Sequence, residues 1–198
     1  MPSPRRKDYF APDPALVEKP LRVRSIYKGR AVGFNVDEIR LPNGRRAARE
    51  YLFHHGAVGV LPFLDRDTVV LVRQFRYPVG KVTLELPAGK LDAGESRMAC
   101  IKRELREETG YTARHIRHLL DFWPTPAFSN ELLRIYVAED LAPGRCCPDH
   151  DEFIEAVRLP FAQALELVWN GRIRDSKTVI ALLAAAALRG RPKARRAA

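Results

Sequence analysis

Three glutamates within five residues, Glu104, Glu107 and Glu108, are the strongest chemical signal in this sequence. A helix would place Glu104 and Glu108 on one face, with Glu107 on its edge. Like charges at this spacing cost an isolated helix roughly a few tenths of a kcal/mol each. The macrodipole also disfavours anions near the helix C-terminus. A hard divalent cation would offset both penalties, because Mg²⁺ prefers carboxylate, water and phosphate oxygens.

The alternative is a solvated acidic face that is neutralised by neighbouring cations. Lys102, Arg103 and Arg106 lie at suitable positions on the same expected helix. A pair of glutamates on a helix, taken alone, is usually of this kind. The spacing of the residues around the pair therefore decides between the two interpretations.

The elements expected around the glutamates are a strand, a tight turn and a helix. Val82–Leu86 is expected to form a short strand that runs into Pro87, Ala88 and Gly89. The helix is expected at Glu95–Thr109, with an apolar face formed by Met98, Ile101 and Leu105. Gly110 then stands where helix C-termini favour glycine.

Elsewhere the pattern mixes strands and helices without regular alternation, which favours a mixed sheet with helices packed on it. Residues 21–55 are expected to form an antiparallel β unit around the turn at Pro42, Asn43 and Gly44. Further strands are expected at Gly56–Phe63, Thr68–Phe75, His115–Trp123, Leu132–Glu139 and Glu152–Leu159, and helices at Phe161–Asn170 and Asp175–Arg189.

Composition and charge limit the class of protein. The 198 residues include 46% hydrophobic and 29% charged residues, as in globular domains. No apolar run is long enough to span a membrane. Three cysteines, an odd number, and the lack of a secretory signal favour the cytoplasm. Residues 1–20 are expected to be an extended lead-in, and 190–198 a basic tail.

The net charge of +10 has two interpretations. Much of the excess lies in the two tails, where solvated charge is the simpler explanation. The remainder is spread over the body of the chain and would favour a phosphate-rich ligand.

The segment GKLDAGESRMACIKRELREETGY, from Gly89 to Tyr111, resembles the Nudix box at each of its defined positions. The resemblance implies a Nudix fold: an α/β, or α+β, mixed sheet between helices at residues 56–189, preceded by the N-terminal antiparallel β unit. It also implies a hydrolase of phosphoric anhydride bonds that uses Mg²⁺, with Mn²⁺ as a possible substitute.

The resemblance further implies roles for individual residues. Gly89 would let the backbone turn tightly, and the Ala88 carbonyl would point at a metal ion. Glu104 and Glu108 would be the main metal ligands, with Glu107 as a nearby catalytic group. Arg103 would hold Glu95, or the loop that contains it, by a charge-assisted hydrogen bond.

A downstream glutamate completes the set that the resemblance implies. Glu152 would be a metal ligand or the general base, although Asp149 and Asp151 flank it and leave the assignment open by a residue or two. A base on a mobile loop would allow closure to exclude water.

Sequence outside the box resembles the ADP-ribose pyrophosphatase branch, notably LVRQFRYPVGKVTLELPAGKLDAGE and the segment Trp123–Glu131. Pro126 occupies the place of that branch's proline, beyond Gly110. Arg49 and Arg76 would contact the substrate, and Glu85 would bind the nucleotide or support the metal ions. An exposed strand carboxylate remains an alternative for Glu85. The expected reaction converts ADP-ribose to AMP and ribose 5-phosphate.

Three other expectations concern substrates and partners. Another nucleoside diphosphate conjugate, such as an NDP-sugar or a dinucleotide, is the alternative substrate. A non-catalytic RNA-binding Nudix module is disfavoured, because such a module has no need of Glu104, Glu107 and Glu108. The chain also lacks an aromatic-rich single-strand motif. The resemblance also implies a homodimer that exchanges N-terminal strands, for which residues 21–53 are suited.

Overall fold

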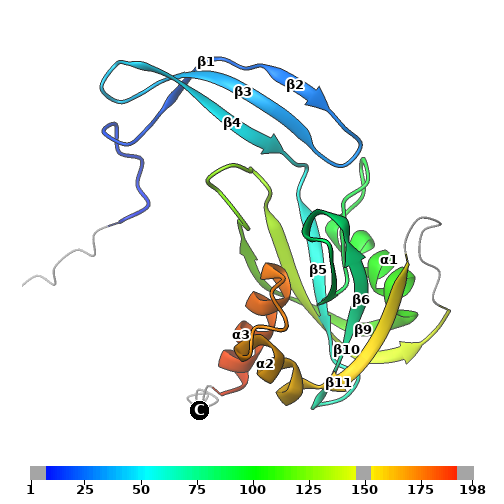
Figure 1. Cartoon of the computed structure of the whole chain (residues 1–198). Helices are drawn as coiled ribbons and strands as arrows, with labels where there is room; N and C mark the ends of the chain where they lie inside the picture. Colours follow the sequence, from blue (N-terminus) through cyan, green and yellow to red (C-terminus); the bar gives the residue numbers. More distant parts are fainter. Residues whose placement is uncertain (1–7, 146–152, 191–198) are drawn as a thin grey trace, which may run out of the picture. The chain divides into compact units, whose positions relative to one another are not determined.

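The computed structural model describes residues 8–145 and 153–190 (Figure 1). The chain divides into two compact units. The first contains the described residues up to His54 together with Thr125–Asn130, and the second contains His55–Pro124 and the described residues from Glu131 onward.

The first unit is a four-stranded antiparallel sheet built on β3 (Gly33–Arg40). β4 (Arg46–Phe53) follows β3 through a turn in which Gly44 has φ +84°, a conformation that favours glycine. β1 (Lys19–Arg22) and β2 (Ser25–Lys28) pair with β3. Alternating apolar and polar residues at Leu21–Gly29 predict one strand, but the structure has two shorter strands there. Val23 and Arg24 separate β1 from β2, and each of the two pairings with β3 contains a register shift.

The second unit contains two sheets. The mixed sheet has the order β8-β5-β10-β9, in which β5 and β10 are parallel and the other pairs antiparallel. The other sheet is antiparallel, with the order β11-β6-β7. In chain order the strands are β5 (Ala57–Pro62), β6 (Thr68–Arg76), β7 (Lys81–Glu85), β8 (Ala88–Lys90), β9 (Tyr111–Phe122), β10 (Leu133–Pro143) and β11 (Ile154–Pro160), with a 3₁₀ turn at Tyr77–Val79.

Three helices cover these sheets: α1 (Arg97–Thr109), α2 (Phe161–Trp169) and α3 (Ser176–Arg189). The β5 strand is buried along its whole length. Val58 and Val60 pack in the cluster that includes residues of α1, whereas Leu61 packs in the cluster that includes residues of α2 and α3. Successive side chains of a strand point to opposite faces, so helices on both sides explain its continuous apolar run.

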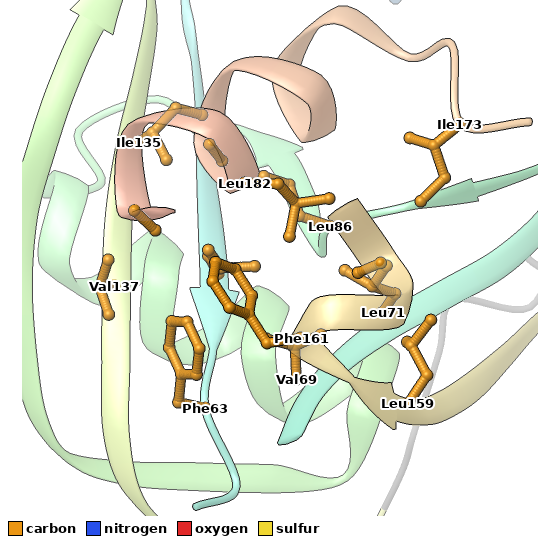
Figure 2. Close-up of a cluster of buried hydrophobic side chains, with 14 of the residues drawn as sticks. Phe63, Val69, Leu71, Leu86, Ile135, Val137, Leu159, Phe161, Ile173 and Leu182 are labelled. Carbon is orange, nitrogen blue, oxygen red and sulfur yellow. The ribbon is translucent and has the colours of Figure 1, made fainter. Parts of the chain in front are cut away.

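Figure 2 shows the larger of these clusters, in which side chains from strands and helices meet. Leu71 comes from β6 and Leu86 from the link between β7 and β8, while Phe161 and Leu182 come from α2 and α3. Leu71, Leu86 and Leu182 have no exposed surface. The expected mixed α/β architecture, with sheet between helices, is thus confirmed.

Several expected boundaries differ in the structure. α1 begins at Arg97 rather than Glu95, because Ser96 is its N-cap and accepts a hydrogen bond from the Ala99 N–H. β9 begins at Tyr111 rather than His115, because its pairing with β10 extends to Pro143. A turn was expected at Pro87, Ala88 and Gly89, but Ala88–Lys90 pairs with Ala57–Gly59 of β5 as a strand.

Within the described ranges, no helix combines the length and the apolar character needed to cross a membrane.

Candidate active site

The two ends of α1 are fixed by local interactions, and these set where its acidic side chains lie. The loop before α1 turns at Gly94, with φ +79°, and the Asp92 N–H donates to the Glu95 carboxylate over 3.1 Å. At the other end Gly110 adopts φ +73°, and its N–H donates to the Arg106 carbonyl. Helix C-termini favour a left-handed glycine for this reason, so the expected role of Gly110 is confirmed.

The carboxylates of Glu104 and Glu108 both lie against β8. Glu108 Oε2 accepts a hydrogen bond from the Ala88 N–H at 3.2 Å. Both residues are buried, with 8% of Glu104 and 3% of Glu108 exposed. The strand therefore brings a short stretch of backbone to two carboxylates that come from successive turns of α1.

Gly89 allows this close approach because it has no side chain. A Cβ added at Gly89 would lie 1.7 Å from Glu104 Oε1 and 2.1 Å from its Cδ. Any larger residue would occupy the space of the carboxylate. A side chain at Gly89 would therefore displace the Glu104 carboxylate from its present position, in addition to any effect on the turn.

Arg103 connects the acidic residues on and before α1. Its Nε and Nη2 donate to the two oxygens of Glu95, each over 3.0 Å, and its Nη1 donates to Glu104 at 2.8 Å and Glu107 at 3.1 Å. Nη2 also donates to the Lys90 carbonyl. The expected contact between Arg103 and Glu95 is therefore present. It ties the loop and the end of β8 to α1.

The charges around Arg103 shift pKa values in opposite directions. The hydrogen bonds from Arg103 lower the pKa of Glu95 to about 2. The same hydrogen bonds raise the pKa of Arg103 above its ordinary value. Burial raises the pKa of the Cys100 thiol to about 12, so this cysteine remains protonated at neutral pH.

The solvated acidic face considered from the sequence is wrong for Glu104 and Glu108, because both are buried. Glu107 matches that alternative better, since it is only half-buried and pairs with Arg103 and, over 3.9 Å, with Arg106. The apolar face of α1 also differs from the expected one. Met98 is 37% exposed, whereas Ile101 and Leu105 are fully buried as expected.

The donor set at β8 suits Mg²⁺. In the described residues no three His, Cys, Asp or Glu side chains form a cluster that could hold a metal ion. Glu104 and Glu108 supply two carboxylates beside one stretch of backbone. Mg²⁺ sites are commonly of this kind, since the ion retains waters and binds one or two carboxylates together with substrate phosphates.

A second charged cluster joins β6, β7 and α3. Arg76 donates from Nε and Nη2 to the two oxygens of Glu85, over 2.9 and 2.8 Å. Glu85 also accepts hydrogen bonds from Thr83 Oγ1 and from Lys177 Nζ. Glu85 is only 2% exposed, so the alternative of an exposed strand carboxylate is wrong.

The pKa of Glu85 reflects this balance of burial and charge. Burial alone would raise its pKa, but the hydrogen bonds from Arg76 and the charge of Lys177 outweigh burial and lower it to about 2. Glu85 is therefore ionised at neutral pH and bound to two cations.

The remaining sequence-predicted residues lie elsewhere. Arg49, on β4 of the first unit, forms an ion pair with Glu18, with Nε to Oε2 at 3.0 Å. Pro126 is exposed in a turn that belongs to the same unit. Glu152, Asp149 and Asp151 lie outside the described residues.

Two features of the site were missed from the sequence. The first is the pairing of β8 with β5, which links residues about 30 positions apart. The second is Lys177. The macrodipole disfavours a cation in the first turn of a helix, where Lys177 lies. Like the glutamates near the C-terminus of α1, Lys177 is therefore a charge at an unfavourable helix end, which indicates a need for a partner of opposite charge.

Both a domain-family model and several known proteins are similar to this chain over most of its length. Residues 53–182 match the sequence model of the NUDIX domain. The chain is 40% identical to the methanol dehydrogenase activator of Bacillus methanolicus, over 83% of this chain and 90% of the relative. It is 36% identical to the ADP-ribose pyrophosphatase of Bacillus subtilis, over 85% and 92%.

Two further matches are a relative named for another substrate and a solved structure. A GDP-mannose pyrophosphatase of Escherichia coli is 38% identical, over 65% of this chain and 71% of the relative. The crystal structure of an ADP compounds hydrolase superposes with a TM-score of 0.76 at 27% identity. That match covers 88% of this chain and 97% of the other.

Proposed function

The chain belongs to the Nudix family and is a hydrolase of pyrophosphate bonds, and from this premise we propose that it cleaves ADP-ribose to AMP and ribose 5-phosphate with Mg²⁺. The observation that carries the proposal is the pair of buried carboxylates, Glu104 and Glu108, held against β8. Relatives named as ADP-ribose pyrophosphatases at 35–36% identity support the choice of substrate.

Glu104 and Glu108 would hold the Mg²⁺ ion, with the Ala88 carbonyl as a further ligand. When bound, the ion would polarise phosphoryl oxygens and lower the pKa of an attacking water, and Mn²⁺ would serve in its place. Neighbouring residues of the chain position the carboxylates. Ala88 orients the Glu108 carboxylate through its N–H, and Arg103 orients Glu104 and Glu107.

The substrate would be held by residues outside this pair. Arg76 would bind a phosphate oxygen, because its side chain is 44% exposed while two of its donors are fixed by Glu85. Arg49 and Pro126 would contact the nucleotide or its distal ribose. Glu152 would act as the general base or as a further metal ligand. Glu107 would support catalysis from beside Glu104.

An NDP-sugar is the alternative substrate, and a GDP-mannose pyrophosphatase among the relatives favours it. Substrate turnover distinguishes the candidates. We expect the purified protein with Mg²⁺ to have its highest kcat/KM for ADP-ribose among ADP-ribose, GDP-mannose, NADH and 8-oxo-dGTP. AMP and ribose 5-phosphate should appear in equal amounts. Preferred turnover of GDP-mannose would establish the alternative, and turnover of the triphosphate alone would refute both.

We also propose a cytoplasmic homodimer assembled through the first unit. That unit exposes apolar side chains on adjacent segments, including Val23, Ile26 and Tyr27, each more than half exposed. Exposed apolar groups gathered in one region are typical of interaction surfaces. Light scattering should give the mass of two chains, and Ile26→Glu should shift it toward one. A monomeric mass for the native protein at micromolar concentration would refute the assembly.

A further inference from the structure

The N-terminus of α3 is tied to the strand segment that leads into the carboxylate site. Asp175 is the N-cap of α3 and accepts a hydrogen bond from the Thr178 N–H. Thr178 Oγ1 in turn accepts one from the Leu86 N–H at 2.8 Å, in the interior of the protein. Leu86 stands between Glu85 and Pro87, two residues before Ala88. The segment 85–88 is therefore held by α3 through Leu86 and by α1 through Ala88.

Lys177 is the charged member of this connection. Its side chain is 10% exposed, and its ammonium group donates to Glu85 and, over 2.9 Å, to Asp175. A buried lysine requires an anionic partner, because removing its charge from water is costly. Lys177 has two such partners, on different elements.

The cluster exposes Arg76, buries Glu85 and Lys177, and half-buries Asp175. Arg76 and Lys177 balance Glu85 and Asp175, so the four groups together are neutral. The side chains of Glu85, Lys177 and Asp175 are 2%, 10% and 19% exposed, whereas that of Arg76 is 44% exposed. Arg76 is fixed along its Nε–Nη2 edge, which leaves the Nη1 amino group directed away from Glu85.

We propose that Lys177 is a positioning residue that offsets the charge of Glu85, so that Glu85 holds the Arg76 guanidinium in place for a phosphate group of the substrate. The inference rests on the proposed function for the identity of the anion as a diphosphate. Glu85 then supports Arg76 and does not itself contact the nucleotide. Without Lys177 the cluster would carry a net negative charge, and Arg76 would attract an anion less strongly.

Binding of inorganic pyrophosphate in EDTA tests the proposal without requiring turnover. We expect calorimetry to show that Lys177→Met weakens pyrophosphate binding by about tenfold or more, the effect of a lost charge in a partly buried site. Lys177→Arg should bind within about threefold of the wild type, because it restores the charge. Lys81→Met is the matched control. It removes one exposed positive charge from the residue opposite Arg76 on β7.

A double-mutant cycle separates positioning from a general loss of structure. In an Arg76→Ala background, Lys177→Met should change pyrophosphate binding by less than about twofold, because its effect passes through Arg76. Equal weakening in both backgrounds would overturn the proposal, and so would equal weakening by Lys81→Met. Failure of the wild type to bind pyrophosphate would overturn it as well.

The binding test of Lys177 and the turnover test of the proposed substrate can fail independently of each other. A coupled effect on pyrophosphate binding, with no hydrolysis of ADP-ribose, would refute the substrate and leave the role of Lys177 intact. If Lys177→Met fails to fold, Lys177→Gln and Lys177→Arg permit the same comparison. A Lys177→Arg variant that folds but has lost binding would then overturn the proposal.

Discussion

Gly89→Ala places the smallest possible side chain where the Glu104 carboxylate lies. The new Cβ would be 1.7 Å from Glu104 Oε1, and ordinary contact begins at 3.4 Å, so the two groups must separate by about 1.7 Å. Because a misplacement of about 1 Å can cost about 100-fold in rate, we expect kcat/KM to fall by at least about 100-fold. The Mg²⁺ concentration for half-maximal activity should rise.

The stability of this variant gives a second measurement. Overpacking typically costs about 1–3 kcal/mol in the free energy of unfolding, which urea titration measures. In a Glu104→Asp background the shorter side chain leaves room, so the same substitution should cost less. Gly190→Ala is the control, because its Cβ would meet nothing closer than 3.6 Å. A kcat/KM for Gly89→Ala within about twofold of wild type would refute the proposed geometry.

Three further predictions follow from other contacts. Glu108→Gln should keep the fold and lower turnover by orders of magnitude, with a metal-free melting temperature no lower than that of the wild type; near-normal activity would contradict a metal-ligand role. Folding lowers the pKa of Glu85, so the stability that its ion pairs provide is present above the unfolded pKa of about 4.5 and is lost as pH falls toward 2. In urea titrations from pH 5 to pH 2, the free energy of unfolding of the wild type should fall by about 3 kcal/mol more than that of Glu85→Gln. Parallel curves for the two proteins would argue against the ion pairs. Leu182→Ala should lower the free energy of unfolding by about 2–5 kcal/mol, since this side chain is fully buried; a loss well below 1 kcal/mol would place it outside the core.

Local patterns in the sequence were sufficient for much of the fold. The helix that carries Glu104 and Glu108 follows from its apolar spacing and from Gly110, and both signals operate within a few residues. The turn at Gly44 and the end of α2, expected at Asn170 and found at Trp169, were accessible for the same reason. Strand starts were less accurate, because pairing with a distant strand decides them, as at Tyr111 with Pro143.

The candidate site was predicted less completely than the helix that carries it. The spacing of the glutamates indicated which side chains share a face of α1, and their misplacement against the macrodipole indicated a need for cations. The spacing did not indicate that β8 lies beside the glutamates, or that Gly89 makes room for Glu104. Arg76 and Glu85 were both expected at the substrate, but the structure pairs them with each other.

The sequence by itself determined the type of chemistry, because residue type and spacing along a helix fix which carboxylates lie together. Only the tertiary structure decided which charges are buried and which partners neutralise them. Lys177 is 92 residues from Glu85 along the chain, so no local pattern connects them. Their contact exists because α3 packs against the strands, and burial then makes the pairing of charges obligatory.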